Sequence, residues 1–224
     1  MTVANEWVGL AADDEIKDLK NFALGVQEYR RQMVGAREDT LGTAGQLTQR
    51  RQLLPWLTGA TYGQMTASDV FDGALHSFAG GASGFAFFSD SDFDNPGKIL
   101  ALSSAAGLAV DFEDHLFTGT SVVAPDHIVN TSNVLAAAGM RIDLDVWMVV
   151  TPASRGVLKF RLLLPFLSVT NMNACELISG RTHNFEVTTH NTLEVSLGAS
   201  STVVLHLSPQ AGVCKATSLW YPTS

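Results

Sequence analysis

Residues 140–165, MRIDLDVWMVVTPASRGVLKFRLLLP, decide the fold that the sequence predicts. In the first half, apolar side chains occupy every second position from Ile142 to Val150, with polar ones such as Asp143 between them. The second half alternates in the same way from Leu158 to Leu164. Such alternation is typical of a half-buried strand, because successive side chains point to opposite sides of a sheet. The stretch therefore predicts two strands, at 140–150 and 158–164.

The six residues between these strands, TPASRG at 151–156, favour a break in the chain direction. Proline lacks a backbone donor, and glycine adopts positive φ without strain. The two strands could pair as a hairpin, which would set Asp143 and Asp145 across from Lys159 and Arg161. They could instead cross between the two sheets of a sandwich, as a jelly roll requires. The local sequence does not choose between these arrangements.

Charged residues are scarce in this chain. They make up 16% of its 224 residues, while hydrophobic residues make up 46%, against roughly 25% charged residues in an ordinary soluble domain. Obligate interfaces are depleted in charge, so we expect neighbouring subunits to cover much of the surface. The alternative is a monomeric β domain with a sticky surface. The net charge of −8 argues against a subunit that binds nucleic acid by itself.

Compartment signals are few. No apolar run approaches the roughly 20 residues of a membrane span, and the acidic N-terminus lacks the basic-then-apolar order of a signal peptide. Cys175 and Cys214 are too few for a disulfide scaffold. They therefore favour a reducing compartment.

The first 80 residues predict a helical N-terminal extension. A helix is expected over 13–34, with Asp13 as its cap, Gly35 at its end and apolar residues on one face. This helix is either an arm that docks on a neighbouring subunit or an ordinary helix packed on its own domain. Shorter helices are expected at 43–54 and 69–79.

Residues 81–224 predict a β-sandwich domain. Short apolar runs alternate there with clusters of Gly, Ser, Asp and Asn, which is typical of this fold class. Besides the two central strands, strands are expected at 84–88, 98–103, 108–112, 184–188, 192–197, 202–207 and 213–220.

Motifs for catalysis are missing. The sequence has no nucleophile elbow, no phosphate-binding glycine loop and no cysteine framework for zinc. A jelly-roll oxygenase or cupin would need two histidines and a carboxylate around one metal. The adjacent pairs Asp114-His115 and Asp126-His127 would point to opposite faces of a strand. We therefore predict no catalytic, cofactor-binding or metal-binding residues, and surface or loop positions for the six histidines, His76, His115, His127, His183, His190 and His206.

The acidic run at 90–97, DSDFDNPG, superficially resembles the start of a calcium loop. Such a loop needs glycine at its sixth position and glutamate at its twelfth, where this chain has Asn95 and Ala101. A solvated turn is the main interpretation. A looser calcium site on Asp90, Asp92 and Asp94 is the alternative.

The order of segments from residue 133 onwards resembles a known family. Residues 133–139, NVLAAAG, read as a one-turn apolar helix that leads into the two central strands. NFEV at 184–187, TLEVS at 192–196, the strand 202–207, Pro209 and a last strand toward Trp220 follow. This order resembles the coat proteins of plant picorna-like viruses, the comovirus, nepovirus and cheravirus group.

The resemblance implies an eight-stranded antiparallel jelly roll that assembles with its own copies and related coat proteins. The product would be an icosahedral shell around single-stranded RNA, held weakly and without sequence specificity. It implies a virion protein assembled in the host cytoplasm, without contact to a membrane, and not an enzyme. The competing class is a cupin-like metal-dependent enzyme or a carbohydrate-binding module. The residues expected to carry assembly are Phe22, Val26, Tyr29, Met33, Phe85, Phe87 and Phe88.

Overall fold

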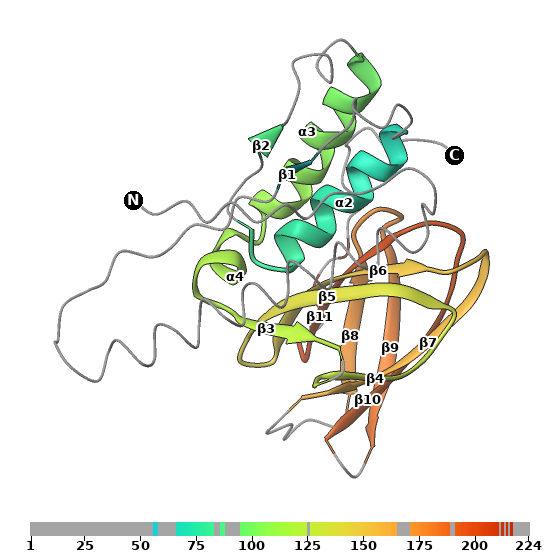
Figure 1. Cartoon of the computed structure of the whole chain (residues 1–224). Helices are drawn as coiled ribbons and strands as arrows, with labels where there is room; N and C mark the ends of the chain where they lie inside the picture. The colour runs from blue at the N-terminus through green and yellow to red at the C-terminus, as the bar shows by residue number, and fades with distance from the viewer. Residues whose placement is uncertain are drawn as a thin grey trace, which may run out of the picture.

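The computed structural model describes residues 56–57, 66–82, 86–87, 95–124, 126–164, 171–188, 191–210, 212, 214 and 216. These residues form a layer of helices that lies on an antiparallel β-sandwich (Figure 1). The prediction of a mainly β, antiparallel fold is confirmed. The large sheet has nine strands rather than the eight that were predicted.

Two helices make up most of the helical layer. Helix α2 (Ala67–Ala79) confirms the prediction at 69–79 and begins with a capping box. Thr66 Oγ1 accepts from the Asp69 N–H at 3.2 Å, and Asp69 Oδ2 accepts from the Thr66 N–H at 2.6 Å. Helix α3 (Pro96–Val110) begins at Asn95, whose Oδ1 accepts from the Gly97 N–H at 3.0 Å. A short helix, α4 (Glu113–Thr118), follows.

Helix α3 corrects two predictions. The strands expected at 98–103 and 108–112 are wrong, because both segments lie in or at the end of α3. A short apolar run does not by itself distinguish a buried strand from a buried helix. The deciding signals here are the Asn-Pro start and the Ala- and Leu-rich composition, which favours helix.

The large sheet has the strand order β3-β5-β6-β11-β8-β9-β10-β7-β4. A separate small sheet consists of two two-residue strands, β1 (Trp56–Leu57) and β2 (Ala86–Phe87), which pair in parallel. The sheet strands are β3 (Thr120–Val123), β4 (Ile128–Ser132), β5 (Val134–Ile142), β6 (Asp145–Pro152), β7 (Gly156–Leu163), β8 (Asn171–Glu176), β9 (Arg181–Thr188), β10 (Thr192–Ala199) and β11 (Val203–Ser208).

The predicted strand at 140–150 is two strands. Strands β5 and β6 form a hairpin whose turn includes Asp143 with a φ of 53°, a conformation that aspartate tolerates better than most residues. The one-turn helix expected at 133–139 is also wrong, because most of this segment belongs to β5 and pairs with β6. Gly139 shows why the pairing is close: a Cβ there would lie 2.6 Å from the backbone oxygen of Trp147.

The connection from β6 to β7 joins two strands that have different partners within one nine-stranded sheet. Strand β6 pairs with β5 and β11, whereas β7 pairs with β10 and β4. The hairpin alternative is wrong, so Asp143 and Asp145 do not lie opposite Lys159 and Arg161. The side chain of Asn133 holds the connection, because its Oδ1 accepts from the N–H and the hydroxyl of Ser154, each at 2.9 Å.

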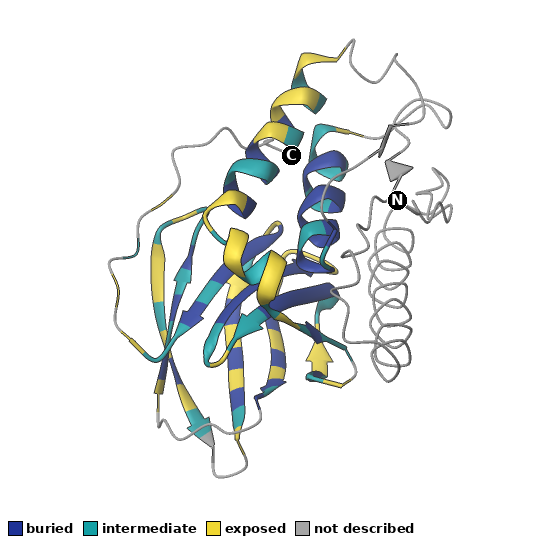
Figure 2. Ribbon diagram, turned by 90° about the vertical axis from the view of Figure 1, so that its left-hand side faces the viewer, coloured by how far each residue is buried: buried dark blue, intermediate teal, exposed yellow. Residues whose placement is uncertain are grey.

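Two apolar cores share the central strands β5, β6 and β11. The inner core lies between the two faces of the sandwich and includes Met148, Phe160 and Leu205. The outer core lies between the helices and the opposite face of the same strands, where Leu75 and Leu108 meet Trp147. Figure 2 shows the result: the strands under the helices are largely buried, whereas those at the far side carry alternating exposed residues.

The other predicted helices and strands are either confirmed or lie mostly outside the described residues, and three observed strands were not predicted. Those at 158–164, 184–188, 192–197 and 202–207 are confirmed as β7, β9, β10 and β11, with boundaries shifted by a few residues. Strands β3, β4 and β8 were not predicted. The helices expected at 13–34 and 43–54 lie outside the described residues, as do most of the strands at 84–88 and 213–220.

Candidate functional site

Polar residues mark both ends of the sheet face that the helices cover. Along β6, alternate side chains on this face are Asp145, Trp147, Val149 and Thr151. The apolar middle belongs to the outer core. Asp145 begins one polar cluster and Thr151 belongs to another, so the covered face carries two separate candidate sites.

The first cluster joins α2 to the ends of β6 and β11. His76 is fully buried, and its Nε2 lies 2.9 Å from Thr151 Oγ1. Thr151 Oγ1 lies 2.6 Å from Thr202 Oγ1, and Thr202 is hydrogen-bonded to the side chain of Asp72. Asp72 and His76 are one helical turn apart, which places both on the side of α2 that faces the sheet.

Burial reverses the usual order of acidity in this cluster. Burial raises the pKa of Asp72 to about 7, with a smaller increase from the charge of Asp69, against the hydrogen bond from Thr202. Burial also lowers the pKa of His76 to about 4. The carboxyl group therefore holds a proton more tightly than the imidazole does, and both groups are neutral from about pH 4 to 7.

The second cluster joins α4 to the other end of the covered face. Oδ1 of Asp145 lies 2.6 Å from His206 Nε2 on β11 and 3.1 Å from His115 Nε2 on α4. The ring of Phe112 packs edge-on against His206, with 5.0 Å between centroids, and stacks on Trp147. Two histidines thus hold the carboxylate, and an aromatic ring packs against one of them.

Asp145 is held in its ionised form. Partial burial acts to raise its pKa, but the hydrogen bonds from His115 and His206, together with their charges, outweigh burial and lower the pKa of Asp145 well below its usual range. A carboxylate of this kind is a poor general acid near neutral pH. It can orient the two imidazoles, stabilise positive charge on them and anchor α4 to the sheet.

Neither cluster shows a metal-binding arrangement. Among the residues that the structure describes, no group of three or more His, Cys, Asp or Glu side chains is placed to hold a metal ion. In the second cluster both histidine nitrogens approach the same carboxylate oxygen, as hydrogen-bond partners do. Ligands of one metal would instead surround a shared point about 2 Å from each donor atom.

The histidines occupy several environments that the sequence did not predict. Two of them, His115 and His206, meet at Asp145 rather than at acids next to them in the chain. His127 is part-buried, and burial together with the charge of Arg141 lowers its pKa. His190 lies outside the described ranges. The prediction of surface or loop positions is therefore wrong for the buried His76. It is also wrong for the part-buried His115, His183 and His206, which lie in α4, β9 and β11.

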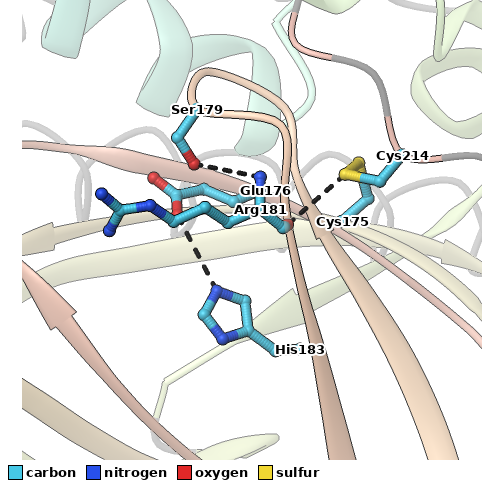
Figure 3. Close-up of a disulfide and its surroundings, with 6 residues drawn as sticks. All are labelled: Cys175, Glu176, Ser179, Arg181, His183 and Cys214. Carbon is cyan, nitrogen blue, oxygen red and sulfur yellow. Dashed lines mark hydrogen bonds and ion pairs between the residues drawn. A yellow bond between two sulfur atoms is a disulfide. The ribbon is translucent and has the colours of Figure 1, made fainter.

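A disulfide corrects the prediction of reduced cysteines. Cys175 on β8 is bonded to Cys214, which lies beyond β11 (Figure 3). Beside the bond, Glu176 Oε2 lies 3.8 Å from Nε2 of His183, whose ring stacks on Phe185. The sequence contained the possible pair, but the compartment argument pointed the other way.

The predicted assembly and calcium residues cannot be compared with the described structure. Phe87 lies in the short strand β2, without a described side chain. The others lie outside the described residues, and they are Phe22, Val26, Tyr29, Met33, Phe85, Phe88, Asp90, Asp92 and Asp94. Within the described ranges, no helix is long and apolar enough to cross a membrane.

Comparisons with known proteins give a fold but no family. No protein-family model and no curated protein matches the sequence. Among solved structures, the maltogenic α-amylase AmyB of Thermotoga neapolitana matches 87% of this chain and 48% of its own, with 7% identity and a TM-score of 0.51. The α-amylase of H. orenii matches 89% of this chain and 49% of its own, with 11% identity and a TM-score of 0.46.

A third solved structure matches with a similar TM-score. The α-amylase of Geobacillus thermoleovorans covers 69% of this chain and 39% of its own, with 9% identity and a TM-score of 0.46. The chain thus spans about two fifths to one half of the length of these structures. At such identities the likeness shows the fold alone.

The comparisons correct the prediction about enzymes. The sequence was interpreted as that of a protein that is not an enzyme, whereas the match with a TM-score above 0.5 is an enzyme, the maltogenic α-amylase AmyB. The coat-protein resemblance stays a prediction, because none of these matches bears on it.

Proposed function

We propose that this chain forms the β-sandwich part of a glycoside hydrolase that acts on α-glucans. The observation that carries the proposal is the match to the maltogenic α-amylase AmyB over 87% of the chain. The match covers more of the chain than the sheet alone, which spans residues 120–208. This makes a chance likeness between two common sandwiches a weaker explanation.

The positions of Asp72 and Asp145 decide whether their carboxyl groups could form the catalytic pair. Glycoside hydrolysis uses two carboxyl groups about 5–10 Å apart, one protonated and one ionised. Asp72 and Asp145 have those opposite states. However, Asp72 is linked to Thr151, which lies six residues from Asp145 on one strand, or about 20 Å at 3.3 Å per residue. The two groups therefore cannot flank one glycosidic bond.

The described sandwich accordingly has a supporting role in the proposed enzyme. Asp145 fastens α4 to the sheet, and the cluster of Asp72 and the buried His76 fastens α2, so both clusters join layers. We assign the catalytic carboxyl pair to residues other than these two. The open face of β7 and β10 carries Lys159, Arg161 and Glu194 rather than the aromatic side chains that stack on sugar rings.

Hydrolysis and binding of α-glucans test the proposal. The purified chain should release reducing ends from soluble starch or maltodextrin, or be retarded in gels that contain amylose, but not in gels with xylan. Asp72→Asn and Asp145→Asn should leave either signal in place, because neither group belongs to the catalytic pair. Absence of both hydrolysis and retardation with a folded protein would refute the proposal.

A capsid subunit is the second candidate, favoured by the exposed surface of α3. Ile99, Leu100 and Val110 are 43%, 46% and 67% exposed on this helix, whose sequence holds one charged residue, Lys98. A helix that is apolar all round is normally covered. Under this candidate function, the chain has the jelly-roll topology, assembles with related coat proteins around RNA, and is located in a virion. Electron microscopy distinguishes the two candidates, because a coat protein forms closed shells and the proposed hydrolase does not.

A further inference from the structure

An unbroken row of hydrogen bonds begins and ends on helix α2. Asp72 is hydrogen-bonded to the hydroxyl of Thr202, just before β11. Thr202 Oγ1 lies 2.6 Å from Thr151 Oγ1 on β6, and that atom lies 2.9 Å from Nε2 of His76. Thr151, Thr202 and His76 are all buried, so bulk water does not compete for their hydrogen bonds.

The hydrogen count gives this row a direction. Each threonine hydroxyl has one hydrogen to donate. When Asp72 is ionised it only accepts, so Thr202 donates to Asp72, Thr151 donates to Thr202, and His76 must donate its Nε2 hydrogen to Thr151. When Asp72 instead donates its own proton to Thr202, every bond reverses. Nε2 of His76 is then an acceptor, and the neutral ring carries its hydrogen on Nδ1.

We propose that Asp72, Thr202, Thr151 and His76 form a proton relay in which the charge of Asp72 sets the tautomer of His76. One proton is taken up at Nδ1 of His76, and Nε2 passes its hydrogen to Thr151. Thr151 passes its own hydrogen to Thr202, which protonates Asp72. The row gains one proton in total, each oxygen in it keeps its normal valence, and the imidazole ends neutral.

The surroundings of the two ends support this assignment. No described residue is a hydrogen-bond partner of His76 Nδ1, so no fixed contact holds the ring in one tautomer. Burial lowers the pKa of His76 to about 4 and raises that of Asp72 to about 7. Between these values the extra proton belongs on the carboxyl group, at the far end of the row from the imidazole.

Within the described part of the chain, few other charged groups lie on α2 and the elements packed against it. Asp69, one turn before Asp72 on α2, raises the pKa of Asp72. On the elements packed against α2, the charged residues are Lys98 at the start of α3, Arg141 near the end of β5 and Asp145 at the start of β6. His206, the titratable group of β11, is hydrogen-bonded to Asp145 at the opposite end of the covered face.

Nitrogen NMR of the full chain, labelled with ¹⁵N-histidine, tests the relay. We expect the neutral His76 ring to carry its hydrogen on Nε2 at pH 8 and on Nδ1 at pH 5, with the change centred near pH 7. The same tautomer at both pH values, or a doubly protonated ring at pH 5, would overturn the proposal.

Substitutions within the row separate a relay from a local effect. Thr202→Val removes the hydroxyl that connects Asp72 to Thr151, so the tautomer of His76 should no longer change between pH 5 and 8. Thr120→Val, at an exposed position on β3, is the matched control and should leave the change intact. Asp72→Asn gives a second test if Thr202→Val does not fold, because it removes the titrating group. Persistence of the pH-dependent change in either Thr202→Val or Asp72→Asn would refute the relay.

Discussion

Strands β6 and β7 follow each other in the chain, yet they lie in different environments. Every residue of β6 after Asp145 is buried, because the sandwich core covers one face and the helices cover the other. Along β7, exposed residues alternate with buried ones, so one face is in contact with solvent. The sequences reflect this difference: VWMVV in β6 is an unbroken apolar run, whereas VLKFRLL in β7 is interrupted by charges.

The difference teaches where this molecule is sensitive to change. A strand in a sheet covered on both sides must satisfy packing at every position. A strand covered on one side does so only at alternate positions. Substitutions in β5, β6 and β11 should therefore be harmful on either face, and those in β7 and β10 only on the inner face.

The largest effect is expected at the outer face of β6. Trp147 is fully buried beneath the helices, so Trp147→Ala should lower the free energy of unfolding by about 3–5 kcal/mol through lost burial and a cavity. Val157→Ala, at a 54% exposed position of β7, should change it by less than about 0.5 kcal/mol. Urea denaturation measures both, and equal effects would remove the distinction between the two strands.

The disulfide should have the next largest effect. It links Cys175 and Cys214, which are 39 residues apart, and so restricts the unfolded chain over β9, β10 and β11. Cys214→Ser should lower the free energy of unfolding by about 2–4 kcal/mol. Wild-type protein under reducing conditions should lose a similar amount, whereas the reductant should leave the variant unchanged. A variant as stable as the oxidised wild type would contradict this expectation.

Asp72 and His76 on α2 predict a pH dependence of stability of moderate size. Because the pKa of Asp72 is raised in the folded state, the folded chain binds an extra proton between about pH 3.8 and 7, and stability falls as pH rises through that range. Because the pKa of His76 is lowered, the unfolded chain binds an extra proton between about pH 4 and 6.5, and stability falls as pH decreases.

These opposite effects cancel in wild-type protein from about pH 4 to 6.5. Asp72→Asn removes the first effect, so the stability of the variant should fall by up to about 1.4 kcal/mol per pH unit as pH decreases through this range. Urea denaturation at half-unit pH steps measures the slope. Identical slopes for the wild type and the variant would show that Asp72 does not hold a proton in the folded state.

The smallest effect is expected on the open face of the sandwich. Arg161 on β7 forms an ion pair with Glu194 on β10, with 2.7 Å between Nη2 and Oε1, but both side chains are about half exposed. Solvent screening should limit the loss in Glu194→Gln to less than about 1 kcal/mol. The same denaturation assay in low and high salt checks this. A larger loss that persists in high salt would show that this face contributes more than its exposure suggests.

The same contrast explains which strands the sequence could predict. Strands β7 and β10 alternate because one face meets water, and their positions were predicted within two residues. Helix α3 and strand β5 are apolar on most sides, so they carry little periodic signal. All of α3 and the part of β5 at 134–139 were assigned to the wrong class. The turn at Asp143 was missed because its flanking residues continue the alternation.

The candidate sites were largely beyond the reach of sequence reasoning. Asp145 meets His115 and His206 from 30 and 61 residues away, a distance that only the complete fold closes. One signal was present: Asp145 and His206 are polar residues in or beside apolar strand runs. Polar residues are unusual on a sheet face that helices cover. The buried Thr151 and Thr202 gave no comparable signal, because threonine is common in exposed strands.

The passage from β6 to β7 also has a consequence for how the molecule forms. Neither strand finds a partner in its successor: β6 needs β11, about 50 residues later, and β7 needs β10, about 35 residues later. Loop closure of this length must precede most of the stabilising contacts, which slows folding in proteins rich in distant pairings. During synthesis, the run VWMVV would thus wait with an open edge until β11 emerges, a period in which a chaperone would have most to protect.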